Sequence, residues 1–230
     1  MTISVIIPTL NEEMVLVPTL RHTATLGFHE VIVVDGGSTD RTLELAGACC
    51  VDTTNTRIIT APRGRARQMN AGAKASGGDI LLFLHADTRL PGEAGRLVSS
   101  ALEDSAVVGG RFDVRFDSPS AWGRVISAMM NIRSRLTGIA TGDQAMFVRR
   151  GVFERLGGFS DIPLMEDIDL SRRMKRAGTV AALHDTVTTS FRRWETRGPV
   201  RTILLMWILR FLYWIGVSPY RLIHFYAAVR

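Results

Sequence analysis

A run of five large apolar residues at 80–84 is followed at once by His85, Ala86 and Asp87. The run is preceded by Gly77 and Gly78, and it suits a strand buried on both faces, which is typical of a parallel sheet. In open α/β sheets, ligands bind outside the carboxyl ends of the strands. Asp87 is therefore predicted to face a ligand crevice, although a turn residue is an equally simple role for it in isolation.

Similar apolar runs alternate with helical segments through the first 90 residues. We expect strands at 5–7, 31–34, 58–59 and 80–84, and helices at 11–26, 42–48 and 64–75. Asn11, Glu12 and Glu13 would start the first helix, and Ser38 or Thr39 would cap the second. This alternation predicts an α/β fold in which a Rossmann-like, mostly parallel central sheet is flanked by helices.

The second half of the chain mixes the same elements less regularly. We expect helices at 91–103, 122–136 and 164–176, strands at 107–108 and 111–116, and a return to the sheet at 142–148. Apolar and polar residues alternate over 111–116, which predicts a strand with one buried face. A chain of 230 residues suits one α/β domain with a C-terminal appendage.

That appendage contains an apolar stretch at 202–217, interrupted only by Arg210. A membrane-spanning helix needs about 20 mostly apolar residues, so this shorter, charged stretch is not expected to span. Its aromatic residues and flanking arginines suit a helix lying in the interface of an anionic membrane. The open alternative is a helix that packs on the core or on a second copy of the chain, which would give a homodimer.

The net charge of +6 suits a nucleic acid, an anionic membrane or a phosphorylated substrate. The only cysteines, Cys49 and Cys50, are adjacent and poorly placed for a mutual disulfide. Residues 1–8 lack the features of a signal peptide. We therefore expect a cytoplasmic protein, peripheral on the inner face of the cell membrane if 202–217 docks there.

Four segments are informative because of their sequences and their order along the chain: IIPTLNE at 6–12, VVDGGSTD at 33–40, FLHAD at 83–87 and EDIDL at 166–170. With them the chain resembles the family 2 glycosyltransferases of the GT-A fold, over residues 3–194. The resemblance implies a glycosyltransferase domain at 1–198, with a nucleotide-sugar-binding half at 1–90 and an acceptor-side half at 91–198. The apolar and basic helical segment at 199–230 would follow it.

The resemblance also implies an activity. It implies an inverting, metal-dependent transfer of one sugar from a nucleoside-diphosphate sugar to a hydroxyl acceptor, for which a lipid or another membrane-associated molecule is a candidate. The implied donor-binding residues are Pro8, Thr9, Asn11, Glu12, Asp35, Arg65, Arg67, Ala86 and Asp87. Carboxylates such as Asp35 can accept hydrogen bonds from a base or ribose, and arginines suit phosphates.

Asp87 matches the last carboxylate of the family's Asp-x-Asp motif, which holds Mg²⁺ or Mn²⁺. His85 stands at the first position of that motif, a departure from the family pattern. Histidine tolerates Mn²⁺ better than Mg²⁺, which prefers oxygen ligands, so the identity of the divalent cation stays open. His184 is a further candidate ligand, against the alternative of a structural histidine.

On the acceptor side, Asp167 aligns with the family's general base, which would take the proton of the acceptor hydroxyl. Glu166 would orient the acceptor, and both carboxylates also suit a helix N-terminus. The other implied acceptor residues are Gly142, Asp143, Arg193 and Trp194. Ser190 replaces the glutamine of the Gln-x-x-Arg-Trp motif of processive synthases, which favours transfer of a single sugar.

Two other classes compete with this interpretation. A sugar nucleotidyltransferase would carry a glycine-rich basic phosphate loop after the first strand, and a dinucleotide oxidoreductase would carry Gly-x-Gly-x-x-Gly there. Residues 8–12 match neither. A non-catalytic module that binds nucleic acid or a membrane surface is the other alternative. No nucleic acid is expected, because Asp35, Asp87 and Asp167 would repel it from the crevice.

Overall fold

The computed structural model describes residues 1–51 and 55–227. The strands are β1 (Ile3–Thr9), β2 (Glu30–Asp35), β3 (Thr56–Thr60), β4 (Ile80–Phe83), β5 (Thr88–Arg89), β6 (Val107–Phe116), β7 (Phe147–Arg149) and β8 (Thr179–Thr189). The helices are α1 (Leu16–Ala24), α2 (Thr42–Val51), α3 (Arg65–Ala75), α4 (Ala94–Ala101), α5 (Ala121–Thr137), α6 (Arg150–Arg155), α7 (Glu166–Ala177), α8 (Arg192–Arg197), α9 (Pro199–Trp214) and α10 (Pro219–Ala227). A 3-10 turn, η1, spans Gly142–Gln144.

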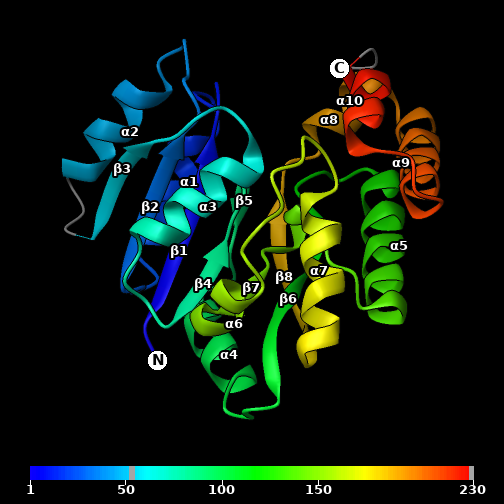
Figure 1. The fold of residues 1–230 in the computed structure, drawn as a ribbon. Coiled ribbons are helices and arrows are strands. Elements are labelled where there is room, and N and C mark those ends of the chain that lie inside the picture. Colours follow the sequence, from blue (N-terminus) through cyan, green and yellow to red (C-terminus); the bar gives the residue numbers. More distant parts are fainter. Residues whose placement is uncertain (52–54, 228–230) are drawn as a thin grey trace.

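Within the described residues the strands form one sheet in the order β3-β2-β1-β4-β7-β6-β8-β5. Strands β1 to β4 are mutually parallel where they pair. Strand β7 runs antiparallel to β4 and β6, and β5 runs antiparallel to β8, which is itself parallel to β6. The mostly parallel central sheet predicted from the sequence is thus confirmed (Figure 1).

The two faces of the sheet are covered by different helices because side chains alternate along each strand. Val5 and Ile7 of β1 belong to the core under α1, α2, α4 and α5. Ile6, between them, belongs to the core under α3, α6 and α7. Helix α3 lies very close to the sheet: a Cβ built on its Gly72 would lie 2.5 Å from Cγ2 of Ile6. Glycine at this position therefore sets how closely the helix approaches.

The start of the first helix differs from the sequence prediction. Helix α1 begins at Leu16, not at residue 11, because Asn11 has a φ of 55° and ends the regular backbone there. The backbone N–H of Asn11 donates to Oγ of Ser38 (2.9 Å), and its Oδ1 accepts from the backbone N–H of Thr39 (2.8 Å). Ser38 and Thr39 thus join two loops, and the prediction that one of them caps α2 is wrong.

Helix α2 is instead capped by Asp40. Its Oδ1 accepts from the backbone N–H of Thr42, the first residue of the helix, at 3.0 Å. A carboxylate there also suits the positive end of the helix dipole. The predicted helix is therefore present, with its cap one or two residues later along the chain.

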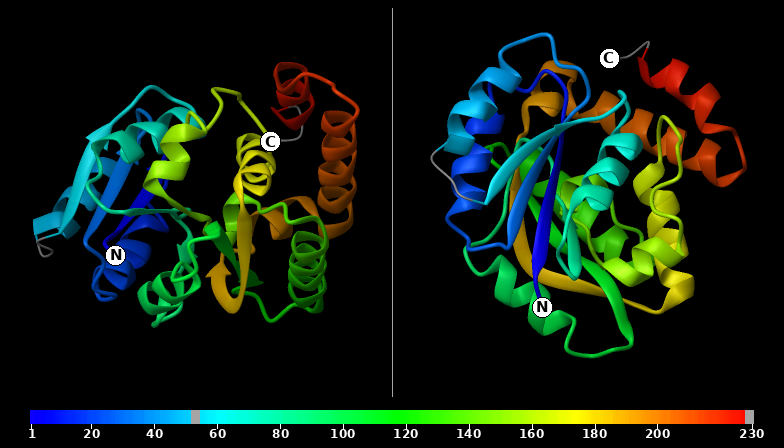
Figure 2. Two further views of the ribbon diagram at one scale, coloured as in Figure 1. Left: turned by 60° about the horizontal axis from the view of Figure 1, so that its bottom comes forward. Right: turned by 60° about the vertical axis from the view of Figure 1, so that its left-hand side comes forward.

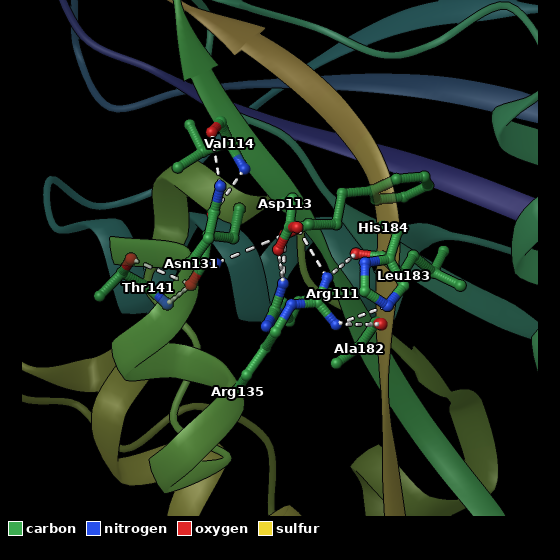
Figure 3. Close-up of polar contacts among 11 residues, drawn as sticks. Arg111, Asp113, Val114, Asn131, Arg135, Thr141, Ala182, Leu183 and His184 are labelled. Carbon is green, nitrogen blue, oxygen red and sulfur yellow. Dashed lines mark hydrogen bonds and ion pairs between the residues drawn. The ribbon is translucent and has the colours of Figure 1, made fainter. Parts of the chain in front are cut away.

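Two predictions for the second half of the sheet also need correction. Residues 107–116 form one continuous strand in which only Arg115 is exposed, so the predicted alternation of burial over 111–116 is wrong. Both faces of β6 are covered by helices, and the buried Arg111 is paired with Asp113 (Figure 3). Likewise, the predicted return to the sheet at 142–148 begins only at Phe147, because the residues before it form η1.

The C-terminal segment packs on the domain through one face only. Met165 and Ile168, at the start of α7, form a small core with Leu209 of α9 and Leu222 of α10. The guanidinium carbon of Arg172 lies 5.1 Å from the ring centroid of Tyr213. Both views of Figure 2 place α9 and α10 on the side of the molecule opposite α2 and β3.

Helix α9 begins at Pro199, next to the boundary expected at residue 198, and the division into separate domains stays a prediction. Among the described residues, no helix combines the length and apolar character that crossing a membrane requires.

Candidate active site

A cavity of about 730 Å³ opens where β1 and β4 end, and it extends to α5, α7 and α9. Most of the residues predicted from the sequence line it. They are Pro8, Glu12, Arg65, His85, Ala86, Asp87, Gly142, Asp143, Glu166, Asp167 and Trp194. Segments separated by more than 150 residues therefore meet at one site, as expected for the carboxyl edge of a parallel sheet.

Several predicted donor-binding residues lie outside the lining of this cavity and form hydrogen bonds with neighbouring loops and strands. Asp35 is 1% exposed, and its Oδ2 accepts from the backbone N–H groups of Gly37 (2.8 Å) and Ser38 (2.9 Å). Thr9 is buried and donates to the carbonyl oxygen of Val34. As placed, Asp35 shapes the loop that follows β2. Its direct contact with a nucleotide, like that of Thr9 and Asn11, stays a prediction.

Two predicted arginines have different surroundings. Nε of Arg67 donates to Oδ1 of Asp161 at 2.8 Å, outside the cavity lining. The side chain of Arg193 lies outside the described part of the structure. The contribution of both residues to a substrate site stays a prediction.

His184 does not lie with the other candidate metal ligands. It is exposed on β8, and its Nε2 lies 3.2 Å from Nη1 of Arg135 (Figure 3). Arg135 also donates to Asp113 (2.6 Å) and to the carbonyl oxygens of Ala182 and Leu183 (each 3.1 Å). The histidine thus lies at the exposed edge of the ion pairs that Asp113 forms with Arg111 and Arg135, away from the cavity lining, which argues against a role in holding a metal.

His85 is held by residues of the acceptor side. Its Nδ1 lies 3.0 Å from Oδ1 of Asp143. Its Nε2 is buried without a hydrogen-bond partner in the described chain, and a Cβ on Gly142 would come within 2.4 Å of it. Nδ1 of His85 faces Asp143, and Nε2 is covered by Gly142 of η1. The structure therefore favours a role for His85 as a hydrogen-bond partner of Asp143 over a role as a metal ligand.

Asp87 is the best-placed carboxylate for a cation. Within the described residues its side chain accepts a long hydrogen bond from Oγ1 of Thr88 (3.4 Å) and forms no salt bridge, and it lines the cavity with Glu12. Burial, and then the charge of Asp87, raise the pKa of Glu12 above its ordinary value, while Arg192 opposes this shift. Two carboxylates that repel each other beside a cavity are suited to sharing a positive ligand.

The described residues contain no group of three or more histidine, cysteine, aspartate or glutamate side chains that could enclose a metal. Mg²⁺ and similar cations often bind through one or two carboxylates, with substrate phosphates and water as the other ligands. The donor set around Asp87 fits that mode of binding and does not fit a cage made of protein alone.

The first turn of α7 brings two more carboxylates to the cavity. Met165 has a φ of 71°, which turns the chain sharply into the helix. Oδ2 of Asp167 accepts from the backbone N–H of Gly142 at 2.9 Å. This bond fixes one oxygen of the carboxylate, so Asp167 is held in place without a neutralising salt bridge in the described chain.

Glu166 is 3% exposed, and its Oε1 lies 3.5 Å from Nη1 of Arg65, at the start of α3. Burial raises the pKa of Glu166, and the charge of Arg65 works against that shift. Burial would lower the pKa of Arg65, but Glu166 and Asp167 outweigh it and raise the pKa instead. The pair therefore connects the two halves of the domain and keeps a charged arginine beside the cavity.

The acceptor side of the cavity includes residues that the sequence interpretation did not assign. Besides Trp194, its apolar wall comes from α5 and α9, and each helix also contributes one arginine. These residues are Ile126, Met129, Met130, Arg133, Ile203, Met206, Trp207 and Arg210. The available sequence signals were the single charge in the apolar stretch of α9 and the helical spacing of apolar residues ahead of Arg133.

Comparison with known proteins identifies the family to which the chain is similar. The family model "Glycosyl transferase family 2" matches residues 4–157. Over 160 residues the chain is 37% identical to an undecaprenyl-phosphate 4-deoxy-4-formamido-L-arabinose transferase of Pseudomonas paraeruginosa, covering 64% of this chain and 46% of that protein. It is 35% identical over 166 residues to a PGL/p-HBAD biosynthesis glycosyltransferase of Mycobacterium tuberculosis, covering 68% and 62%. The chain thus spans about half the length of the first of these relatives.

Solved structures show the fold. S. aureus TarS 1–349 in complex with UDP-GlcNAc matches with a TM-score of 0.68 and 20% identity, covering 83% of this chain and 58% of that one. The mannosyltransferase PcManGT of Pyrobaculum calidifontis, in complex with GDP-Man and Mn²⁺, matches with a TM-score of 0.66 and 21% identity, covering 81% and 56%. These likenesses confirm the predicted GT-A fold. Together with the family model, which covers most of the domain, they show that the chain belongs to glycosyltransferase family 2.

Proposed function

We propose that this protein transfers one sugar from a nucleoside-diphosphate sugar to an acceptor hydroxyl. The observation that carries the proposal is that Asp87, in the loop between β4 and β5, and Asp167, at the start of α7, line one cavity. Such a reaction needs a negatively charged group that anchors the donor's cation and another that accepts the acceptor's proton.

On the donor side, Asp87 would hold a divalent cation, Mn²⁺ or Mg²⁺, together with the donor's phosphates. When bound, that cation would neutralise the charge that develops on the departing nucleoside diphosphate. Pro8, Glu12 and Ala86 line the same end of the cavity. The charged Arg65 would contribute a guanidinium to the phosphates, a group well suited to them. A structural neighbour that binds GDP-Man and Mn²⁺ supports this arrangement.

On the acceptor side, Asp167 would take the proton of the attacking hydroxyl. The hydrogen bond from Gly142 holds Oδ2, so Oδ1, whose hydrogen bond among the described residues comes from the neighbouring Ile168 N–H (2.7 Å), would be the proton acceptor. Attack from the face opposite the leaving group would invert the anomeric centre. Trp194 would stack on a sugar ring, and Asp143 with His85 would border the acceptor.

The test is a panel of nucleoside-diphosphate sugars assayed for slow hydrolysis with Mn²⁺, with Mg²⁺ and with a chelator. We expect hydrolysis of at least one donor that stops when the cation is removed. A chain that neither binds nor hydrolyses any donor with either cation would overturn the proposed function. The stereochemistry of a product formed with a simple alcohol would decide between inversion and retention.

We also propose that α5 and α9 dock on a membrane surface, which would place the enzyme beside membrane-associated acceptors. Both helices expose an apolar stripe that adjoins the cavity at Met129 and Trp207. The residues of each stripe are spaced by three or four positions, as on one helix face. On α5 these residues are Trp122, Val125, Met129, Ile132 and Leu136, and on α9 they are Val200, Leu204, Trp207, Ile208, Phe211 and Trp214. Aromatic residues and nearby arginines are typical of interfacial helices.

Replacing both Ile208 and Phe211 with Ser is expected to weaken binding to anionic liposomes by about 100-fold or more. Each buried apolar side chain of this size contributes about 1.5–3 kcal/mol, and 1.4 kcal/mol is tenfold in affinity. Sedimentation with liposomes would measure the loss. Substitution is preferable to truncation at residue 198, because removing α9 would expose Met165 and Ile168 of the adjoining core.

The matched control replaces Met14, which precedes α1, and Leu43 of α2 with Ser; both are exposed and neither belongs to α5 or α9. This variant should sediment like the wild type, and high salt or alkaline carbonate should release both. Equal binding by all three proteins would contradict docking through α9. Retention of the wild type on carbonate-washed membranes would contradict a peripheral mode of binding.

A further inference from the structure

Helices α5 and α9 present the same pattern of residues to the cavity. On α5 the lining residues include Ile126, Met129, Met130 and Arg133, and on α9 they include Ile203, Met206, Trp207 and Arg210. In both cases three apolar residues are followed by an arginine at the spacing i, i+3, i+4 and i+7, which is a single helix face. The cavity thus has two apolar walls, each ending in a guanidinium.

The two guanidinium groups lack partners in the described chain. Nε and Nη2 of Arg133 are buried without a hydrogen-bond partner, and neither arginine forms a salt bridge there. Burial, and then the charge of Arg210, lower the pKa of Arg133 to about 10. Burial also lowers the pKa of Arg210. Unpaired buried charges are costly, and proteins ordinarily pair them.

The position of Arg133 is fixed by its neighbours on α5. The side-chain amide of Asn131 exchanges two hydrogen bonds with the backbone of Val114, each 2.9 Å, and Arg135 binds Asp113 and the carbonyl oxygens of β8 (Figure 3). These two residues hold one face of the helix against the sheet. Arg133, halfway between them, is consequently directed to the other face, where the cavity lies.

Among the described residues, neither of the nearby carboxylates, Asp143 and Asp167, forms a salt bridge with Arg133 or Arg210. The charges of Asp167 and Asp143 act favourably on both arginines, but Asp167 is bound to Gly142 and Asp143 lies 3.0 Å from His85. A ligand anion would therefore meet two guanidinium groups with free N–H donors. A phosphate monoester has three terminal oxygens and up to two negative charges, so it can accept from both guanidinium groups and balance both positive charges at once.

We propose that Arg133 and Arg210 bind the phosphate group of an amphiphilic acceptor whose apolar chain lies between α5 and α9. The inference rests on the proposed function, because it names the acceptor class of the same cavity. The phosphate would sit next to Asp167 and Asp143, so that the acceptor hydroxyl of the proposed function, carried at the same polar end, would face Asp167 and the donor. The apolar chain would cover Met129, Met206 and Trp207 and leave toward the exposed stripes of the two helices.

The experiment measures binding of octyl phosphate, octanol and inorganic phosphate to the full chain by calorimetry, without any nucleotide. Wild-type protein is expected to bind octyl phosphate more tightly than either of the other two compounds. Arg133→Met and Arg210→Met should each weaken binding of octyl phosphate on the order of 10- to 100-fold, as expected for lost charge-assisted hydrogen bonds, and should leave octanol binding unchanged. Arg124→Met and Arg201→Met, exposed positions on the same helices outside the cavity lining, are the matched controls.

Thermal unfolding separates binding from a structural role. Since Arg133 is an unpaired buried charge, Arg133→Met should unfold at the same temperature as the wild type or a higher one. Unchanged affinity for octyl phosphate in both cavity variants would overturn the proposal. Inorganic phosphate that binds as tightly as octyl phosphate would also overturn it, because the apolar walls would then contribute nothing.

The result does not depend on the test of the proposed function. If the chain binds octyl phosphate through the two arginines but hydrolyses no nucleotide sugar, the phosphate site is supported and the proposed sugar transfer is contradicted. Donor hydrolysis without arginine-dependent binding would do the reverse.

Discussion

Replacing Asp87 with Ala is expected to abolish metal-dependent binding of a nucleoside diphosphate. Asp87 is the carboxylate best placed for the cation, and the described chain offers no cluster of ligands that could replace it. Titration calorimetry with UDP and GDP, with Mn²⁺ and with a chelator, would measure the loss. The fold should survive, because Asp87 accepts one long hydrogen bond and repels Glu12.

The control for this substitution is Asp185→Ala, which removes an exposed carboxylate of β8 outside the cavity lining. It should bind nucleotide and cation like the wild type. Unchanged metal-dependent affinity in Asp87→Ala would show that the cation is held elsewhere or is not used. A melting temperature far below that of the wild type would show that Asp87 has a structural role that its contacts do not reveal.

Asp167→Asn is expected to lower turnover by about 100- to 10,000-fold while donor binding is retained, the range typical of a positioned general base. The amide keeps the shape of the side chain but cannot accept the proton. Turnover would be measured with the donor found in the nucleotide-sugar panel, and donor affinity by calorimetry. Wild-type turnover in this variant would remove Asp167 from the mechanism.

The neighbouring Asp169 provides a contrast on the same helix. Its Oδ2 binds Ser160 (2.7 Å) and Nη2 of Arg173 (2.7 Å), and it does not line the cavity. Asp169→Asn should therefore lower the free energy of unfolding and leave turnover per folded molecule near that of the wild type. Equal losses of turnover in both variants would point to damage at the start of α7, not to proton transfer.

Local patterns in the sequence determined the sheet and the segments that meet at its edge. The apolar runs at 5–7, 31–34 and 80–84 are all buried, and the alternation of strands and helices leaves few topologies open. Asp87 was predicted to face a crevice because it follows such a run closely, whereas Asp167 was predicted from the resemblance of residues 166–170 to the family's acidic segment. The start of α1 was missed because the positive φ of Asn11 depends on hydrogen bonds to Ser38 and Thr39, which come from another loop.

Only the tertiary structure decided which side chains share the cavity. Arg65 meets Glu166 across 101 residues of sequence, and Asp143 meets His85 through the placement of η1. The inward direction of Arg133 and Arg210 depends on how α5 and α9 are rotated about their axes. That rotation is set by contacts such as Arg135 with Asp113 and Tyr213 with Arg172. Spacing along one chain fixes which residues share a helix face, but the packing of distant elements determines what that face meets.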